Sequence, residues 1–402
     1  MSQTWAEYLC APATAAEAVD VVAWRRALHA EPELSLCEVD TQTYVREALV
    51  AQGWQPRAVG GTGLAVVAGR GQGPALLLRA DMDALPVQEQ TGLPFASRRP
   101  GHMHACGHDA HMACLLGVAA RIRQVADQLP GRVVLAFQPG EENGRGAVAM
   151  IEEGLLDGRW CGDPTLRVAA ALGMHVWSGL PVGHVSATSG PVMANVDDFK
   201  VTVRGRGGHG ALPHQAVDAV VASAAVVQAL QAMVSRGNDP MQPLVVTVGS
   251  IHGGSAFNVI AEQVELRGTC RSFGRDLADQ LPNWLRATAV RAAGAYGAQA
   301  DCEYTRYTIA LHNDAAMVEL VAKSAEQVAG VGHVDRTMRM MAGEDFAFFA
   351  EQVPACFYFV GCGPLGAASE PHHSPRFVVD EAAFPLAVEL MGRAVAAWLG
   401  GR

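Results

Sequence analysis

Short apolar runs rich in β-branched residues alternate with a helical pattern through the first half of the chain. The strand-like runs cover residues 64–68, 75–80, 132–137 and 167–172, and the helical pattern covers residues 109–129. Strands that alternate with helices are typical of a sheet with helices packed against it. We therefore predict an α/β fold for this part of the chain.

The pattern changes near residue 197. Strand patterns cover residues 199–203, 244–250, 263–271 and 300–307, and helical patterns cover residues 216–234 and 277–293. This βαββαβ order predicts a compact, ferredoxin-like unit inserted into the first domain. The earlier pattern resumes after residue 311 and ends in a helix over residues 382–399. We expect a discontinuous catalytic domain, residues 1–192 and 309–402, and an inserted domain, residues 193–308.

Composition and charge narrow the classes of partner. The 402 residues are 50% apolar and 17% charged, and the formal net charge is -10. No block of basic residues occurs, so the sequence lacks the electrostatic pattern of a protein that binds nucleic acid or an anionic membrane. A globular protein with a small-molecule substrate, no nucleic-acid partner and no membrane partner is predicted.

Neither the apolar segments nor the cysteines indicate export. The apolar stretch over residues 219–235 contains Ser223, Gln228 and Gln231, so we interpret it as a helix of a soluble domain. No segment resembles a signal peptide, and the nine cysteines form no CxxC pair. We expect a cytoplasmic protein without a disulfide framework or a structural zinc ribbon.

Polar segments follow three of the predicted strands. RADMD at residues 79–83, QPGEE at residues 138–142 and GMH at residues 173–175 each come at or just after the end of an apolar run. In open α/β sheets, functional sites collect beyond the carboxyl ends of the strands. These three segments are therefore expected to contribute to one site.

The densest group of potential metal ligands lies at the start of the predicted helix. Its members are His102, His104, Cys106, His108 and His111. Imidazole and thiolate groups bind zinc and other late first-row metals. Gly107 permits a tight backbone turn, and Asp109 is placed to cap the helix. We predict a metal site rather than a histidine-rich loop without metal, but the spacing leaves open which histidines bind.

Several other polar residues allow a structural as well as a functional interpretation. Glu141 and Glu142 follow a predicted buried strand, where adjacent side chains can point in opposite directions. One of them could bind a cation while its neighbour faces a substrate. His175 lies in an apolar run and could be a hydrogen-bonded core residue. The remaining candidates, which could instead belong to ordinary turns, are Asp81, Asp83, His372 and His373.

Taken together, these segments resemble a known family. Seven motifs span nearly the whole chain: LRADMDALP (78–86), MHACGHDAH (103–111), QPGEE (138–142), GMHV (173–176), GGHGALPH (207–214), GEDF (343–346) and HSP (373–375). In this order they resemble the aminoacylase, hippurate hydrolase and auxin-conjugate (IAA-amino acid) hydrolase family of metal-dependent amidohydrolases in the zinc-peptidase superfamily. The resemblance implies an α/β/α catalytic domain with an inserted lid and dimerisation domain.

The resemblance also implies a set of metal ligands. Two divalent ions per subunit are expected, zinc or manganese, with cobalt or nickel also compatible. The implied ligands are Cys106, His108, Glu142, His175 and His373, with Cys106 as the bridge. Because His372 stands where relatives usually have leucine, the choice of His373 rests on the Ser-Pro spacing.

Other residues receive catalytic and substrate-binding roles from the same resemblance. Glu141 would be the general base that deprotonates the attacking water, and Asp83 would orient a ligand histidine. His209 would stabilise the oxyanion across a dimer interface, so a homodimer through the inserted domain is expected. Asn258 and Arg271 would hold the substrate carboxylate, and His214 would be a wall of the pocket or a structural histidine.

The predicted function is hydrolysis of the amide bond in small N-acyl amino acids of the N-acetyl, N-benzoyl or indoleacetyl type. The main alternative is an exopeptidase, a dipeptidase or another C–N aminohydrolase on the same two-metal fold. A catalytically silent binding protein would lack a ligand or the base, and none is missing from the motifs. A structural zinc protein would unfold on chelation.

Overall fold

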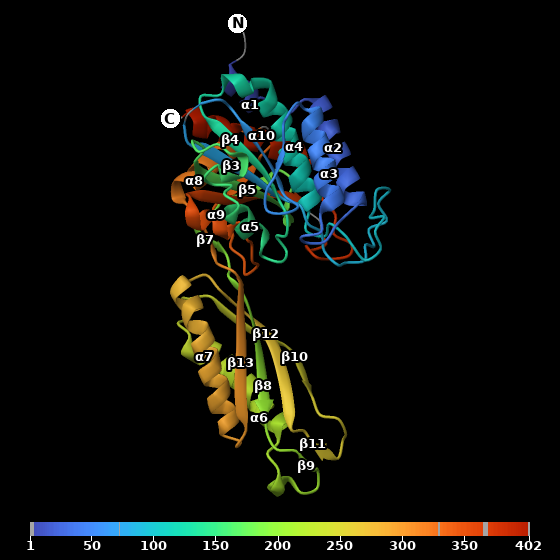
Figure 1. The fold of residues 1–402 in the computed structure, drawn as a ribbon, viewed down its shortest axis with the longest axis vertical. Helices are drawn as coiled ribbons and strands as arrows, with labels where there is room; N and C mark the ends of the chain where they lie inside the picture. The colour runs from blue at the N-terminus through green and yellow to red at the C-terminus, as the bar shows by residue number, and fades with distance from the viewer. Residues whose placement is uncertain (1–3, 72, 329, 365–368, 401–402) are drawn as a thin grey trace. The chain divides into compact units, whose positions relative to one another are not determined.

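The computed structural model describes residues 4–71, 73–328, 330–364 and 369–400. The chain divides into two compact units, which are described separately (Figure 1). Unit 1 comprises the chain up to Gly190, His312–Met338 and the part from Asp345 onward. Unit 2 comprises Pro191–Leu311 and Arg339–Glu344.

Unit 1 is built on a mixed eight-stranded sheet. Its strands, in spatial order, are β1 (Arg57–Ala58), β2 (Leu64–Ala68), β4 (Arg132–Gln138), β3 (Ala75–Asp81), β5 (Val168–Pro181), β16 (Ala355–Gly363), β6 (His184–Ser186) and β15 (His333–Asp335). The central strands β4, β3, β5 and β16 run parallel, whereas β1, β2 and β6 pair antiparallel with a neighbour. β3 and β4 are buried along their whole length because helices cover both faces of the sheet.

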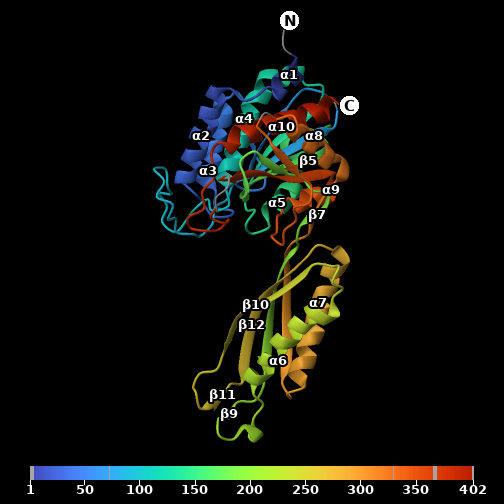
Figure 2. The same cartoon turned by 180° about the vertical axis from the view of Figure 1, so that it is seen from behind.

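The helices of unit 1 form two layers (Figures 1 and 2). α4 (His108–Val125) packs against β3 at the centre of one layer. Its helical neighbours are α1 (Trp5–Cys10), α2 (Ala15–Ala30), α3 (Val39–Ala51) and α10 (Ala383–Gly400), and α8 (Ala315–Ala325) packs against α10. α5 (Gly146–Glu152) and α9 (Ala347–Gln352) pack against each other in the second layer. Short 3-10 turns cover Ala126–Gln128 and Arg159–Cys161.

Unit 2 has the βαββαβ order. Its elements are β8 (Val196–Arg204), α6 (Ala219–Ala232), β10 (Leu244–Gly253), β12 (Gln263–Ser272), α7 (Arg275–Gly294) and β13 (Gln299–Thr308). The antiparallel sheet has the order β10-β12-β8-β13, and α6 and α7 share one apolar core with it. β9 (Gly208–His209) pairs with β11 (Val259–Ile260) outside this sheet. The remaining short elements are β7 (Gly190–Met193), β14 (Leu311–Asn313), a 3-10 turn at Pro213–Gln215 and a π turn at Met233–Gly237.

The predicted α/β class and the βαββαβ unit are confirmed, with two differences in the elements that carry the site. β5 does not end at residue 172 but continues to Pro181, so His175 lies within a strand rather than beyond one. The helix predicted over residues 109–129 is α-helical only to Val125 and then tightens into a 3-10 turn.

Two helical segments, Ala219–Gly237 and Ala383–Gly400, are long and apolar enough to span a membrane by length and composition. In the second, 72% of the most apolar window is buried inside the structure. α10 packs against α1, α4 and α8, and the core of unit 2 includes Ala219, Val226 and Leu230 of α6. Packing within each unit therefore accounts for apolar side chains in both helices.

Candidate metal centre

The five predicted ligands of unit 1 come from four separate segments and meet near the carboxyl ends of the central strands. Cys106 precedes α4, and His108 is its first residue. Glu142 follows β4, His175 lies in β5, and His373 belongs to the segment before α10. Because β3, β4 and β5 are parallel, their carboxyl ends and the segments that follow them lie on the same side of the sheet, at the ends of the strands.

The first group of donor atoms consists of Cys106, His108 and His175. Their sulfur and nitrogen atoms all lie within 4.8 Å of one another. The sulfur of Cys106 is 3.5 Å from Nε2 of His175. Nδ1 of His175 lies 2.5 Å from the carbonyl oxygen of Val176, and Nδ1 of His108 lies 2.8 Å from that of Asp83. A proton on each Nδ1 leaves both Nε2 lone pairs available for a ligand.

The second group consists of Cys106, Glu142 and His373, again with donor atoms within 4.8 Å of one another. Oε1 of Glu142 is 3.5 Å from Nε2 of His373 and 3.9 Å from Nε2 of His108. His373 has a left-handed backbone conformation, with φ of 66°, and its side chain is 55% exposed. Cys106 belongs to both groups, so one sulfur atom lies beside two sets of donors.

Three other histidines of the motifs are engaged in different ways. His111 accepts the N–H of Val176 at Nε2, 2.9 Å away, while its Nδ1 lies 2.6 Å from Asp81. His372 accepts the N–H of Ser178 at 3.1 Å and stacks on Trp177. His104 is fully buried, and burial lowers its pKa to about 4. The spacing of the histidines did not distinguish these roles.

Buried carboxylates surround His108. Oδ2 of Asp81 is 3.8 Å from Nε2 of His108, and Oε2 of Glu141 is 4.0 Å from the same atom. Burial opposes a charge on His108, but the carboxylates of Asp81 and Asp83 outweigh it and raise its pKa to about 10. The surroundings of His108 therefore favour a positive charge at this position.

Several buried polar atoms in this cluster have no hydrogen-bond partner among the described residues: Nε2 of His108, Oε1 of Glu142 and Oδ1 of Asp83. Leaving a buried polar atom without a partner costs about 1 to 3 kcal/mol, and more for a charged group. The first two belong to the candidate ligands. Sulfur, imidazole nitrogen and carboxylate oxygen suit zinc and neighbouring divalent metals, so the donor set fits a metal centre.

Asp83 connects His108 with the loop that carries the glutamates. Oδ1 of Asp83 is 3.3 Å from Nδ1 of His108. Its other oxygen accepts the hydroxyl of Ser35 at 2.6 Å and the N–H of Glu142 at 2.9 Å. This carboxylate therefore fixes the position of two candidate ligands.

A buried ion-pair network that the sequence analysis did not identify lies behind the cluster. Arg79 donates to Asp81 at 2.6 Å and to Asp345 at 2.9 Å, and Gln138 also donates to Asp345. All four of these residues belong to motifs noted above, LRADMDALP, QPGEE and GEDF. The motifs indicated that these residues lie near the site. Which of them pair with one another depends on how β3 and β4 pack.

The prediction that Asp109 caps α4 is wrong. The cap position is occupied by Gly107 with φ of 91°, and a Cβ there would lie 2.5 Å from the side chain of Val176. Asp109 instead points into the core, where its Oδ2 accepts from Nε of Arg25 at 2.8 Å and lies 2.7 Å from Nδ1 of His29. It holds α4 against α2 through buried charges.

The other predicted site residues belong to unit 2. His209 is exposed, and its Nδ1 accepts the N–H of Ala211 at 3.0 Å. Asn258 lies beside it, because its carbonyl accepts the N–H of Gly210 at 2.8 Å. His214 is exposed in a 3-10 turn, with Nε2 3.4 Å from the side-chain nitrogen of Gln215.

Arg271 is not brought beside His209 within unit 2. It lies near the end of β12, eight residues beyond Gln263, which at about 3.3 Å per residue is roughly 26 Å along the strand. Its Nε donates to Thr269 at 3.2 Å, and burial lowers its pKa. Residues predicted to bind one substrate therefore lie at the two ends of this strand.

Comparisons with known proteins agree with the arrangement of motifs. Residues 77–397 match peptidase family M20/M25/M40. The N-acetyl-L-cysteine deacetylase of Bacillus subtilis is 40% identical over 361 residues, 89% of this chain and 83% of the relative. The IAA-amino acid hydrolase ILR1-like 4 of Arabidopsis thaliana is 36% identical over 382 residues, 92% of this chain and 83% of the relative.

A solved structure shows the same similarity in three dimensions. The Bacillus subtilis YXEP protein, described as a dinuclear metal binding peptidase from the M20 family, superimposes with a TM-score of 0.82 at 33% sequence identity. The match covers 96% of this chain and 99% of that structure. The similarity therefore extends through both units rather than through the metal centre alone.

Proposed function

Because this chain belongs to peptidase family M20/M25/M40, we propose that it hydrolyses the amide bond of small N-acyl amino acids with the help of two divalent metal ions. One observation carries the proposal. Cys106 belongs to two adjacent groups of metal-compatible donors, and Glu141 lies beside them without belonging to either. The similarity to an N-acetyl-L-cysteine deacetylase and to an IAA-amino acid hydrolase supports an N-acyl amino acid as substrate.

Cys106, His108 and His175 would hold one ion, and Cys106, Glu142 and His373 would hold the other. Five protein ligands for two ions leave positions for water and substrate. Zinc and manganese are the proposed ions, and cobalt and nickel also suit this donor set. When bound, such ions polarise the scissile carbonyl and lower the pKa of water.

In this mechanism Glu141 moves the proton. Its carboxylate accepts a proton from the water that attacks the amide carbon and then donates it to the leaving nitrogen as the C–N bond breaks. Asp83 keeps His108 in one orientation, since the carbonyl of Asp83 accepts from Nδ1 and leaves Nε2 free to bind. The products are a carboxylic acid and a free amino acid.

The experiment that tests this function measures amino-acid release from N-acetyl, N-benzoyl and indoleacetyl amino acids, with dipeptides assayed in parallel. Faster release from the acylated amino acids is expected. Release from dipeptides alone would favour the exopeptidase alternative, in keeping with the description of the YXEP protein as a peptidase. No release from either class would contradict a hydrolase that acts on small amides.

Removal of metal by a chelator is expected to abolish hydrolysis while the far-ultraviolet circular dichroism stays close to that of the untreated protein. The large apolar core of unit 1 does not depend on the candidate ligands, so the fold is retained. Activity should return on addition of Zn²⁺, Mn²⁺, Co²⁺ or Ni²⁺, and the most effective ion identifies the preferred metal. Unfolding on chelation would instead indicate a structural metal site.

We further propose that unit 2 forms a homodimer in which His209 of one subunit stabilises the oxyanion in the site of the other. His209→Ala alone is expected to lower turnover by about 10² to 10³, the usual effect of losing one oxyanion donor. When Glu141→Ala and His209→Ala proteins are mixed after dissociation, random reassortment into C2 dimers should restore about a quarter of wild-type activity. Failure to restore any activity, in hybrids verified by differently tagged subunits, would contradict a role across the interface.

A further inference from the structure

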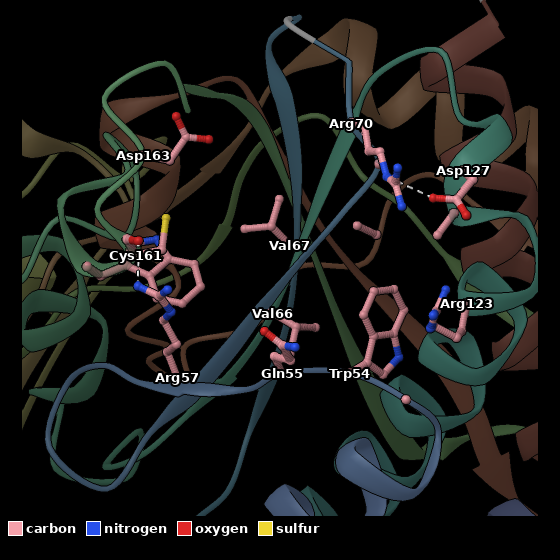
Figure 3. Close-up of a pocket in the computed structure, with 15 residues that line it drawn as sticks. Trp54, Gln55, Arg57, Val66, Val67, Arg70, Arg123, Asp127, Cys161 and Asp163 are labelled. Carbon is pink, nitrogen blue, oxygen red and sulfur yellow. Dashed lines mark hydrogen bonds and ion pairs between the residues drawn. The ribbon is translucent and has the colours of Figure 1, made fainter.

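A pocket separate from the candidate metal centre lies in unit 1 at the β1 edge of the eight-stranded sheet, and we call it the edge pocket (Figure 3). Its volume is about 410 Å³, within the usual range of sites for small molecules. None of the candidate metal ligands lines it. The lining residues that matter for its chemistry are Trp54, Trp160, Arg57, Arg123 and Val67.

The first feature of the edge pocket is an unpaired length of strand. β1 pairs only with Leu64 and Ala65 of β2, so no strand among the described residues pairs with the outer side of Val66–Ala68. The N–H of Val59 donates to the carbonyl of Gly63 at 3.1 Å, so the backbone groups of Gly63 point away from β4. The direction of the backbone groups alternates from one residue to the next along a strand. The backbone groups of Ala65 and Val67 therefore also point away from β4. Within the described parts of the chain, neither the N–H nor the C=O of Val67 has a partner.

The second feature is positive charge without a matching carboxylate. The guanidinium of Arg123 stacks over the ring of Trp54, 5.5 Å from its centroid, and forms no ion pair with any described residue. Arg57 donates to the carbonyl of Cys161 at 2.5 Å and likewise forms no ion pair within the described chain. The carboxylate of Asp163 is paired with Arg132 at 3.0 Å.

These groups are arranged around the free strand edge. In Figure 3, Arg57 and Cys161 lie on one side of Val66 and Val67, and Trp54 and Arg123 lie on the other. An unpaired backbone N–H and C=O bind an amide in the manner of an added strand, and a guanidinium binds a carboxylate through two parallel hydrogen bonds. The indole rings supply apolar walls.

We propose that the edge pocket is an accessory site for a small carboxylate that carries an adjacent amide, the chemistry of an N-acyl amino acid. The backbone of Val67 pairs with the amide, Arg123 on one side of the strand binds the carboxylate, and the indole rings offer apolar contacts to the acyl group. Arg57 on the other side of the strand adds only a longer-range attraction. Binding is non-covalent and involves no reaction. The proposal does not depend on the hydrolytic function, because it rests on a different set of residues.

Isothermal titration of the metal-loaded Glu141→Ala protein with N-benzoylglycine tests the site without consuming the probe. We expect a binding event that Arg123→Gln weakens at least about tenfold, because a charge-assisted hydrogen bond is lost, and that Arg57→Gln weakens by a smaller factor. Arg336→Gln is the matched control, since Arg336 follows the strand at the opposite edge of the same sheet and should leave binding unchanged. Circular dichroism verifies that each variant is folded.

Three further probes separate the contributions of the amide and the carboxylate. Benzoate lacks the amide, N-benzoylglycinamide lacks the carboxylate, and inorganic phosphate offers charge alone. Binding that depends on Arg123 should be strongest for N-benzoylglycine. Equal affinity for phosphate, or no effect of either arginine variant, would overturn the proposal. Binding that survives both variants but disappears with the metal ions belongs to the candidate metal centre, so failure of one proposal is distinguishable from failure of the other.

Discussion

Replacement of Glu141 by alanine is expected to lower turnover of N-acyl amino acids by about 10² to 10⁴, the usual contribution of a positioned general acid-base group. Metal content should stay near that of the unaltered protein, because Glu141 belongs to neither of the two groups of donors that share Cys106, although its carboxylate also lies near His108 and Glu142. Turnover is followed by amino-acid release, and bound metal by elemental analysis of the same samples.

The adjacent Glu142 provides the matched control. Its Oε1 lies 3.5 Å from Nε2 of His373 and 3.9 Å from Nε2 of His108 and has no hydrogen-bond partner among the described residues, so Glu142→Ala should lose metal as well as activity. Both variants remove one carboxylate from the same loop. The metal content of each variant then shows whether the lost carboxylate acted in proton transfer or as a metal ligand. An active Glu141→Ala protein would contradict the proposed mechanism. Loss of metal from that variant would move Glu141 into the ligand set.

The elements predicted correctly from sequence were those with strong periodicity and buried surroundings. Apolar and polar residues alternate along β8 and β12, and α6 and α7 each have an apolar stripe. These patterns left little ambiguity about the βαββαβ unit. The N-terminal helices α1 and α2 were not predicted individually, although Thr4 with Glu7 and Thr14 with Glu17 form capping boxes. A search for that local signal would have identified where both helices start.

The motifs gathered the right segments of unit 1, but they did not assign every histidine. His108 and His111 are both in the first turn of α4, and both are buried. They differ because Nε2 of His111 accepts the N–H of Val176, whereas Nε2 of His108 has no hydrogen-bond partner among the described residues. Val176 is 65 residues away in β5, so this distinction depends on how the strand passes the helix and could not come from spacing.

The error over Asp109 has a similar origin. An aspartate near the start of a helix is a common capping residue, and that local preference was the only signal available. In the folded protein Gly107 makes the turn, and Asp109 faces α2, where Arg25 is 1% exposed. Arg25 is 84 residues away in sequence, so no local pattern connects the two charges.

Replacement of Asp109 by alanine is expected to lower the free energy of unfolding by about 3 to 5 kcal/mol, because it leaves the charge of Arg25 buried without its main partner. Arg25→Met is expected to cost a similar amount. The neighbouring Arg26 is the control: it is 48% exposed and pairs with Glu381, so Arg26→Met should cost no more than about 1 kcal/mol. Urea denaturation of the metal-free proteins measures all three differences.

The pH dependence of this loss identifies its electrostatic origin. Burial alone would raise the pKa of Asp109, but Arg25 and His29 outweigh it and hold that pKa well below its ordinary range. A carboxylate with a depressed folded-state pKa stabilises the protein above its unfolded value of about 3.9, and this contribution is lost as the pH falls below that value. The difference between wild type and Asp109→Ala should therefore shrink below about pH 4, by up to about 1.4 kcal/mol per pH unit. A difference that stays constant down to pH 2.5 would show that Asp109 acts through packing rather than through its charge.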